Sequence, residues 1–268
     1  MNKPSVANVS LPSDLVTLSV LEGHVALVTL NRPSARNAIN AEIANAMHTV
    51  VSWTEANQDI WVVVLTGAGE DVFCAGADLK EVAAGNAASL FTSNGFAGFV
   101  DADRKKPWIA AVNGKALAGG CEIVLACDLV VAANNAAFGL PEVSRGVLAA
   151  AGGLYRLPRA LPRNLAIEMA ITGDSIDAER AAEFGWVSNV VPPEHLLEAA
   201  LALAARITRN APIAVRESLQ IIRRVPDLDT DALRKLTKEC RDRVAASADY
   251  REGPRAFVEK RPPQWTGS

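Results

Sequence analysis

Two continuous apolar runs, at residues 60–67 and 108–114, place the strongest constraint on how this chain can fold. The first, IWVVVLTG, is rich in β-branched residues and has no polar face. The second, WIAAVNG, has the same character until it reaches its final Asn-Gly. Such runs are typical of strands buried on both sides, as in a parallel sheet covered by helices. The sequence therefore predicts an α/β core in which loops at the strand ends carry function.

The segments around these runs show the periods of further strands and helices. Apolar residues alternate, or run together, where strands are expected, and they recur every three or four positions where helices are expected. The predicted elements are a hairpin over 15–21 and 25–30 around Glu22-Gly23, a helix over 40–56, a short apolar helix over 121–127, and a strand over 129–133. This β-β-α alternation supports the α/β assignment.

From about residue 193 onward the pattern becomes helical throughout. Helices are predicted over 193–208, 211–224 and 229–246. Leu233, Leu236, Cys240 and Val244 form one apolar stripe on the third helix, and a stripe that its own subunit does not fully cover favours oligomerisation. We divide the chain into a loose polar N-terminal tail (1–13), an α/β core with the active site (14–192) and a helical oligomerisation segment (193–268).

Composition excludes several classes of function. Half of the 268 residues are hydrophobic and the formal net charge is -3, so the chain can bury a large core and has no global field for nucleic acid or an anionic membrane. The four cysteines form no CxxC pair, which fits a reducing, cytoplasmic environment. The three histidines are scattered without a metal-binding spacing, and we expect no metal site.

The segment from Gly119 to Glu142 carries the residues best suited to chemistry. A helix that opens at Gly119-Gly120 presents unpaired N–H groups, and such an end attracts negative charge. Glu122 lies on the first turn of this otherwise apolar helix, and Glu142 follows Pro141 in another apolar setting. A buried carboxylate needs a partner or a function, so both glutamates are candidate catalytic groups.

The order and spacing of these motifs resemble the enoyl-CoA hydratase/isomerase (crotonase) family over nearly the whole chain. The matching segments are TLNRPSARNA (29–38), CAGADLKE (74–81), VNGKALAGGCEIVLACDLVVAANNAAFGLPE (112–142), the Gly-Gly and RLPR of 152–159, MAITGD (169–174) and EGPRAFVEKR (252–261). The resemblance implies a crotonase-type spiral of β-β-α units with a C-terminal helical segment. It also implies that the substrate is an acyl-CoA thioester.

By this resemblance, the chemistry is the addition of water to a trans-2-enoyl-CoA thioester. The backbone N–H groups of Ala77 and Gly119 would form an oxyanion hole for the enolate oxygen. Glu122 would orient and deprotonate the water, and Glu142 would supply the α-proton, with coupled titrations. Family isomerases rely mainly on the second glutamate, so the pair favours a hydratase or dehydratase.

The resemblance also implies where coenzyme A binds, as part of the substrate and with no separate cofactor. Lys80 matches a family position that contacts it, and Lys260 resembles another that a neighbouring subunit often contributes. Family positions at Ala35, Ala75 and Asp78 are further candidates. Many relatives have a lysine where this chain has Ser34, a difference for which Arg36 could substitute. A homotrimer or a dimer of trimers is the expected assembly.

Residues 147–155 depart from the usual family pattern and leave the acyl group open. Here the chain has Val147 to Ala151 followed by Gly-Gly-Leu-Tyr, which is closer to relatives that act on unusual acyl groups, such as carnitinyl-CoA dehydratase-like proteins. The sequence is also compatible with a double-bond isomerase of the same family and with a non-catalytic acyl-CoA binding protein. Loss of the conjugated enone absorbance of trans-2-enoyl-CoA substrates with formation of a 3-hydroxyacyl product identifies a hydratase, whereas an isomerase gives a shifted alkene and a binding protein gives no turnover.

Overall fold

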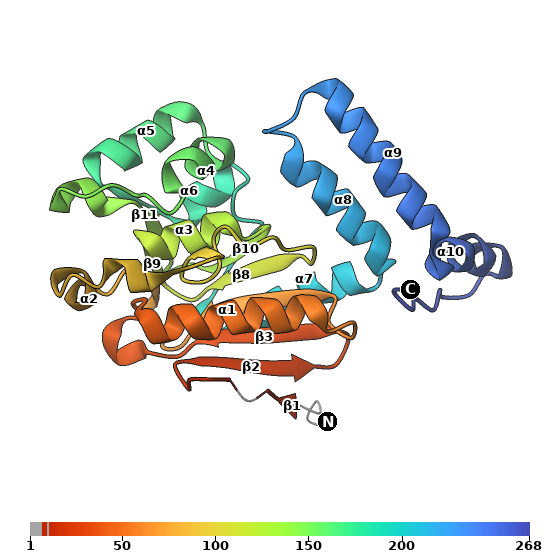
Figure 1. Ribbon diagram of the computed structural model, residues 1–268, viewed down its shortest axis with the longest axis horizontal. Helices are drawn as coiled ribbons and strands as arrows, with labels where there is room; N and C mark the ends of the chain where they lie inside the picture. The colour runs from red at the N-terminus through yellow and green to blue at the C-terminus, as the bar shows by residue number, and fades with distance from the viewer. Residues whose placement is uncertain (1–6, 10) are drawn as a thin grey trace.

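The computed structural model describes residues 7–9 and 11–268, and its α/β core is built on two main sheets (Figure 1). The larger sheet has seven strands in the order β1-β2-β3-β4-β8-β10-β13. These strands are β1 (Ala7–Asn8), β2 (Val16–Leu21), β3 (Val25–Leu30), β4 (Val62–Gly67), β8 (Trp108–Val112), β10 (Leu129–Ala133) and β13 (Asn189–Val191). Neighbours pair in parallel from β3 to β13, whereas β1, β2 and β3 pair antiparallel.

Strands β4 and β8 lie in the middle of this sheet and are buried on both faces. The side chains of β4 from Val62 to Leu65 are 0% exposed. One face packs into the main core, to which α1 (Ala41–Ala56) contributes its buried stripe, and α7 (Leu196–Thr208) covers the other face. The Asn40 side chain begins α1 by accepting a hydrogen bond from Ile43 N–H at 3.0 Å. The prediction of strands covered on both sides is confirmed.

The hairpin predicted around Glu22-Gly23 is also present. Strands β2 and β3 pair in register from Val16 opposite Leu30 to Leu21 opposite Val25. Gly23 (φ +77°) and the next residue, His24 (φ +67°), both adopt the left-handed conformation, as a tight turn between twisted strands requires.

A second, four-stranded sheet carries the loops of the candidate site, in the order β12-β11-β9-β5. Its strands are β5 (Val72–Cys74), β9 (Lys115–Leu117), β11 (Ala137–Gly139) and β12 (Ser175–Asp177). Along the chain, β5 follows β4, β9 follows β8 and β11 follows β10, so each strand of this sheet comes after a strand of the larger one. Each of the three then leads into a helical segment. Those segments are α2 (Leu79–Ala83), α3 (Gly119–Ala126) and the 3-10 helix η3 (Pro141–Arg145). The predicted spiral of β-β-α units is confirmed.

Shorter elements complete the core between and after these units. They are η1 (Pro33–Ala35), η2 (Ala87–Leu90), β6 (Phe91–Thr92), β7 (Gly95–Phe96), α4 (Gly153–Ala160), α5 (Arg163–Thr172), α6 (Ala178–Glu183) and η4 (Pro193–His195). In the part of the chain that the structure describes, no helix has the length and apolarity needed to cross a membrane.

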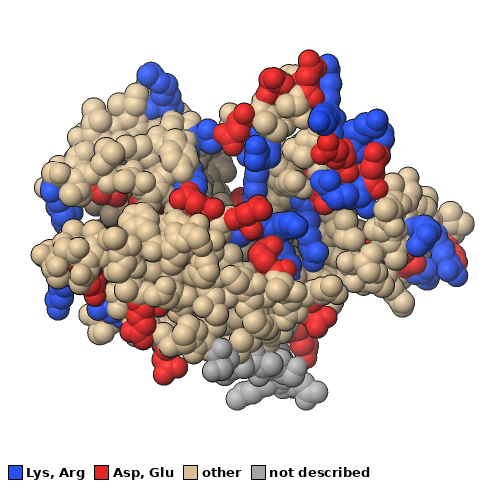
Figure 2. Space-filling model, in the orientation of Figure 1, with Lys and Arg blue, Asp and Glu red and all other residues tan. Residues whose placement is uncertain are grey.

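The C-terminal part is helical, as predicted. After α7 come α8 (Pro212–Arg224), α9 (Thr230–Ala246) and α10 (Ala248–Glu259), and the last of these was not predicted. Helices α8 and α9 project from the core (Figure 1). A cleft of about 1450 Å³ separates them from α4, and charged side chains of both signs gather along it (Figure 2).

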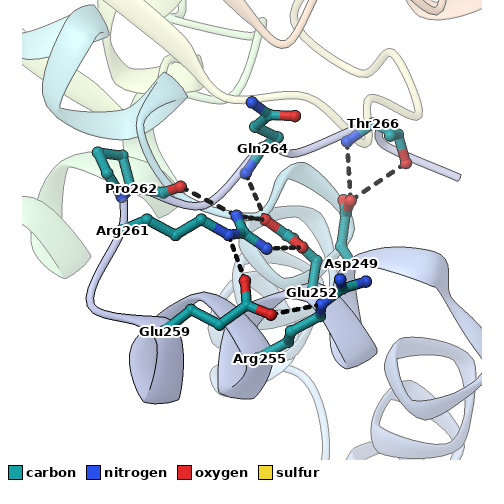
Figure 3. Close-up of polar contacts among 8 residues, drawn as sticks. All are labelled: Asp249, Glu252, Arg255, Glu259, Arg261, Pro262, Gln264 and Thr266. Atoms are coloured by element: carbon teal, nitrogen blue, oxygen red, sulfur yellow. Dashed lines mark hydrogen bonds and ion pairs between the residues drawn. The ribbon is translucent and has the colours of Figure 1, made fainter.

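The last eight residues fold back along α10 (Figure 3). Arg261 forms two hydrogen bonds, of 2.6 and 2.9 Å, with the carboxylate of Glu252. The buried Asp249 side chain accepts hydrogen bonds from the N–H groups of Thr266 (2.8 Å) and Gly267 (3.0 Å). The C-terminus is therefore tied to the start of α10.

The prediction of a loose N-terminal tail over 1–13 needs correction at its C-terminal end. Ala7 pairs with Val20 and Asn8 with Ser19 of β2, and Ser13 is buried, with its hydroxyl donating to Glu42 at 2.5 Å. Val9 and Leu11 also pack against the main core, so backbone pairing to the sheet edge and apolar contacts together order this segment. Residues 1–6 and 10 lie outside the described part.

Candidate active site

The candidate residues lie where three neighbouring parallel strands end. Strands β5, β9 and β11 pair side by side, with Cys74 opposite Ala116 and Leu117 opposite Gly139. Ala77 follows β5, Gly119 and Glu122 follow β9, and Glu142 follows β11. Because parallel strands end at the same edge of a sheet, this edge brings four predicted catalytic positions together.

Ala77 lies in an extended segment that runs beside residues 36–39. Ile39 N–H donates to Gly76 O at 2.8 Å, and Asp78 N–H donates to Ile39 O at 2.8 Å. Successive N–H groups of an extended chain point to opposite sides, so Ala77 N–H points away from Ile39. Among the described residues it has no backbone or side-chain acceptor, and it is left available for a ligand.

Gly119 begins α3 directly beside the same segment. A Cβ built on Gly76 would lie 2.8 Å from Gly119 N, so this approach requires glycine. The preceding residue, Ala118, has φ +51° and ψ -128°, a conformation that costs a non-glycine residue about 1–3 kcal/mol. Its N–H donates to Gly139 O at 2.9 Å, which helps to hold it there. The strained residue immediately precedes the first N–H of α3, whose nitrogen lies next to the Ala77 segment and has no intrahelical acceptor.

Glu122 lies on the first turn of α3 and is 3% exposed. Its Oε1 accepts a 2.8 Å hydrogen bond from Gly153 N–H, at the start of α4. Burial raises the pKa of Glu122 to about 7, the Gly153 hydrogen bond opposes this shift, and the nearby Glu142 charge adds to it. The carboxyl therefore gains or loses a proton near neutral pH.

Glu142 lies in η3 and is 9% exposed. Its Oε2 is buried without a hydrogen-bond partner among the described residues. Burial raises the pKa of this carboxyl, while the charge of Arg145 opposes the shift. An uncompensated buried carboxylate is costly, so Glu142 holds its proton more tightly than an exposed glutamate does.

Two unpaired N–H groups and two buried carboxyls suit a reaction in which a carbonyl oxygen gains negative charge while protons are added and removed. Such N–H groups stabilise an oxygen that gains negative charge, and the carboxyls add one proton and remove another. Comparison with known proteins identifies the family. Residues 21–268 match the family model described as enoyl-CoA hydratase/isomerase. The chain belongs to the enoyl-CoA hydratase/isomerase family.

Individual relatives match over almost their whole length. The chain is 41% identical over 250 residues to the mevalonyl-coenzyme A hydratase sidH of Aspergillus fumigatus, which covers 91% of this chain and 92% of the relative. It is 40% identical over 243 residues to the short-chain-enoyl-CoA hydratase of Clostridium acetobutylicum, which covers 90% and 93%. The crystal structure of a probable enoyl-CoA hydratase/isomerase from Mycobacterium abscessus superposes with a TM-score of 0.89 at 42% identity, over 96% of this chain and 100% of the other.

Some residues predicted to contact coenzyme A lie around a pocket of about 730 Å³. Ala75 and Arg36 line it, and so does Lys115, a second cation that was not predicted. Ala35 lies next to Arg36 in η1. Two cationic side chains therefore line this pocket, together with the acidic Glu70 and Asp71, whereas Ser34 itself has no charge.

The other predicted coenzyme positions differ in what surrounds them. The Asp78 carboxylate accepts from Arg32 at 2.6 Å and from Lys80 N–H at 3.0 Å, so its side chain is already engaged in a cap and an ion pair. Arg32 holds the pKa of Asp78 below its usual value. The Lys80 side chain is exposed on α2. Lys260 follows α10, at the opposite end of the molecule from α2 (Figure 1), so one chain does not bring these two lysines together.

Several residues that shape the site were not predicted. Gly153 stands out in the sequence only as part of a family motif, although it contacts Glu122. The ring of Phe96 lies so close to Gly119 that a Cβ there would be 2.5 Å from it. The signal that could have found Gly153 is the glycine pair at 152–153, which marks a close backbone approach. In the described residues, no group of three or more His, Cys, Asp or Glu side chains is placed to hold a metal ion.

Proposed function

We propose that this protein is an enoyl-CoA hydratase that adds water reversibly, on one face, to a trans-2-enoyl-CoA thioester. The observation that carries the proposal is the pair of buried glutamates, Glu122 and Glu142, next to the free N–H groups of Ala77 and Gly119. The names of the relatives support the same class, because these hydratases share a coenzyme A thioester and differ in the acyl group. The acyl group of this enzyme is left open.

The reaction uses each group of the site once. Glu122, ionised, takes a proton from water as the water oxygen bonds to the β-carbon. The π electrons move toward the thioester carbonyl, whose oxygen becomes enolate-like between the N–H groups of Ala77 and Gly119. Each such donor stabilises the transition state by roughly 3 to 4 kcal/mol in a dry site. Glu142 then gives its proton to the α-carbon, and transfer of a proton from Glu122 to Glu142 restores the enzyme.

The hydrogen bond from Gly153 to Glu122 favours hydration over double-bond isomerisation. An isomerase needs one group to move a proton between carbon atoms, whereas hydration also needs a base fixed against a water molecule. Oε1 of Glu122 accepts from Gly153 N–H at 2.8 Å, and this contact fixes the orientation of the carboxyl that would act on the water. A second oriented carboxyl is the feature that the hydratase reaction requires.

The proposal includes binding of the coenzyme A phosphates by cationic side chains and assembly into a homotrimer or a dimer of trimers. Arg36 and Lys115 on the pocket support the first part. Phe257 (85% exposed) and Val258 (79% exposed) on α10 support the second, because such apolar residues are usually covered. In an assembly of this kind Lys260 of one subunit would serve its neighbour. The four free cysteines fit a cytoplasmic location.

The test is a spectroscopic assay with short and medium trans-2-enoyl-CoA substrates. A hydratase removes the conjugated enone absorbance and forms a 3-hydroxyacyl-CoA product that mass spectrometry identifies by the gain of one water. An unhydrated product with a displaced double bond would identify an isomerase instead. Tight binding without turnover of any chain length would overturn the assignment as an enzyme.

A further inference from the structure

The side chain of Asn37 connects the predicted oxyanion loop to the rest of the core. It is 0% exposed. Its Nδ2 lies 2.9 Å from Ala68 O, 3.0 Å from Val72 O and 3.0 Å from Phe73 O, and its Oδ1 accepts from Arg32 N–H at 2.9 Å. One amide thus satisfies carbonyls at both ends of the 68–73 loop. It does so immediately before the segment that carries Ala77.

The backbone around Asn37 pairs with the same segment. Ala75 N–H donates to Arg36 O at 3.0 Å, and Ile39 and Asp78 form the hydrogen bonds that flank Ala77. The Cys74 thiol donates to Asn37 O at 3.1 Å. Residues 36–39 are therefore the surface against which residues 74–78 are aligned. The direction of Ala77 N–H depends on that alignment.

Packing leaves little room for the loop to adjust if the amide is lost. A Cβ on Gly67 would lie 2.5 Å from Phe73 O and 2.9 Å from Asn37 Nδ2. Asn37 itself has φ +52°, which asparagine tolerates better than most residues. The burial, the positive φ and the hydrogen bonds of Asn37 all hold its amide against the carbonyls of the 68–73 loop. The structure offers no second donor to Val72 O and Phe73 O among the described side chains.

We infer that Asn37 is a positioning residue for the reaction, which sets the direction of the Ala77 N–H in the oxyanion hole. This inference rests on the proposed function. Oxyanion donors act through their geometry, and a displacement of about 1 Å costs on the order of 10²-fold in rate. The amide itself does not touch the substrate. It acts by fixing the carbonyls of Val72 and Phe73, and through them the extended segment that follows.

The test measures polarisation of the bound thioester directly. The probe is a 3-arylacryloyl-CoA, whose absorption band moves to the red when its carbonyl oxygen is held by hydrogen-bond donors. Spectra are recorded in the Glu122→Gln background, which stops hydration of the probe, with and without Asn37→Gly. Glycine keeps the positive φ at position 37 and removes only the side chain.

Asn37→Gly is expected to lose most of the red shift while the dissociation constant of the probe stays within about threefold, because binding of coenzyme A does not use the amide. In the otherwise unchanged enzyme it should lower kcat by about 10- to 100-fold with little change in KM. Should Asn37→Gly not fold, Asn37→Ser, which keeps one donor, is measured in its place, and a partial loss of the shift is expected.

The matched control is Asn113→Ala. Asn113, which follows β8, is also a buried asparagine, but it contacts only the start of this loop, accepting from Gly67 N–H at 3.1 Å and donating to Gly69 O at 2.7 Å. It should lower the unfolding temperature and retain the red shift. An equal loss of the shift in both variants, or a full shift in Asn37→Gly, overturns the positioning role. Absence of a red shift in the Glu122→Gln background would instead refute the oxyanion hole of the proposed function.

Discussion

The N–H of Gly153 donates a 2.8 Å hydrogen bond to Oε1 of Glu122, across 31 residues of sequence. This bond joins the start of α4 to the first turn of α3 and fixes the orientation of a carboxyl that is almost completely buried. It also supplies one of the few favourable interactions for the ionised form. The position and the acidity of Glu122 therefore depend on the same contact.

Each glutamate should be needed for turnover. Glu122→Gln and Glu142→Gln are expected to lower kcat by about 10²-fold or more, because the amide neither accepts nor supplies the proton, while binding of coenzyme A changes little. Steady-state hydration assays and calorimetric titration with coenzyme A measure the two effects. Glu168→Gln, an exposed glutamate on α5, is the control and should be silent. Near-normal hydration by either site variant would refute the two-carboxyl assignment.

The raised pKa of Glu122 should make stability depend on pH. Its value of about 7, against an ordinary 4.5, means that the folded protein holds the proton more tightly than the unfolded chain. The free energy of unfolding from this group is greatest below about pH 4.5 and falls as pH rises through about 7. Glutamine does not titrate, so Glu122→Gln does not lose this stability as pH rises. The free energy of unfolding of the variant, relative to that of the original protein, should therefore increase by up to about 3 kcal/mol from low to high pH.

Urea unfolding of both proteins at about pH 5 and pH 8 measures that difference. Glu142 is present in both proteins, so the difference reports Glu122 together with its coupling to Glu142. A stability difference that does not change with pH would mean that Glu122 titrates in the folded protein as it does in the unfolded one.

The rate of hydration should fall on the acidic side of about pH 7, because Glu122 must be ionised to accept a proton from water. A basic limb is expected where Glu142, whose pKa is also raised, loses the proton that it donates. The two apparent values belong to the coupled pair. A profile of kcat/KM from about pH 5 to 9 tests this, and a rate without an acidic limb in that range would exclude Glu122 as the base.

Gly153→Ala should disturb Glu122 without changing its chemical identity. A Cβ at this position would lie 2.9 Å from Leu140 Cδ1 and 3.1 Å from both Cγ and Oε1 of Glu122. The carboxyl must move, so kcat should fall by roughly tenfold or more. The control is Gly253→Ala in α10, where the new methyl group would meet only Trp265 at 3.4 Å. Unchanged kcat in Gly153→Ala would show that the orientation of Glu122 is unimportant.

Asp249→Asn should loosen the C-terminal tail shown in Figure 3. The buried carboxylate accepts from Thr266 and Gly267 N–H groups, and the amide nitrogen of asparagine would face one of these donors. A loss of about 1–3 kcal/mol in the free energy of unfolding is expected, with faster carboxypeptidase digestion of the tail. Asp242→Asn, exposed on α9, is the control. Equal digestion of both variants would contradict the anchoring role.

The sequence alone predicted the elements whose signal is local. The β-branched run of β4 is typical of a strand buried on both faces, and Gly23 marks the hairpin turn between β2 and β3. The motif order also indicated the family, the β-β-α spiral, and Glu122 and Glu142 as candidates. The three-residue strands of the second sheet were missed because such short segments have no detectable period.

What only the tertiary structure decided is how distant segments meet. The contact of Gly153 with Glu122, the strained φ of Ala118 and the unsatisfied Oε2 of Glu142 all arise where three strand ends converge. Period and propensity describe how a residue relates to its neighbours along the chain. The acidity of a carboxyl and the direction of an N–H are instead set by desolvation and by partners remote in sequence, which exist only after the chain has folded.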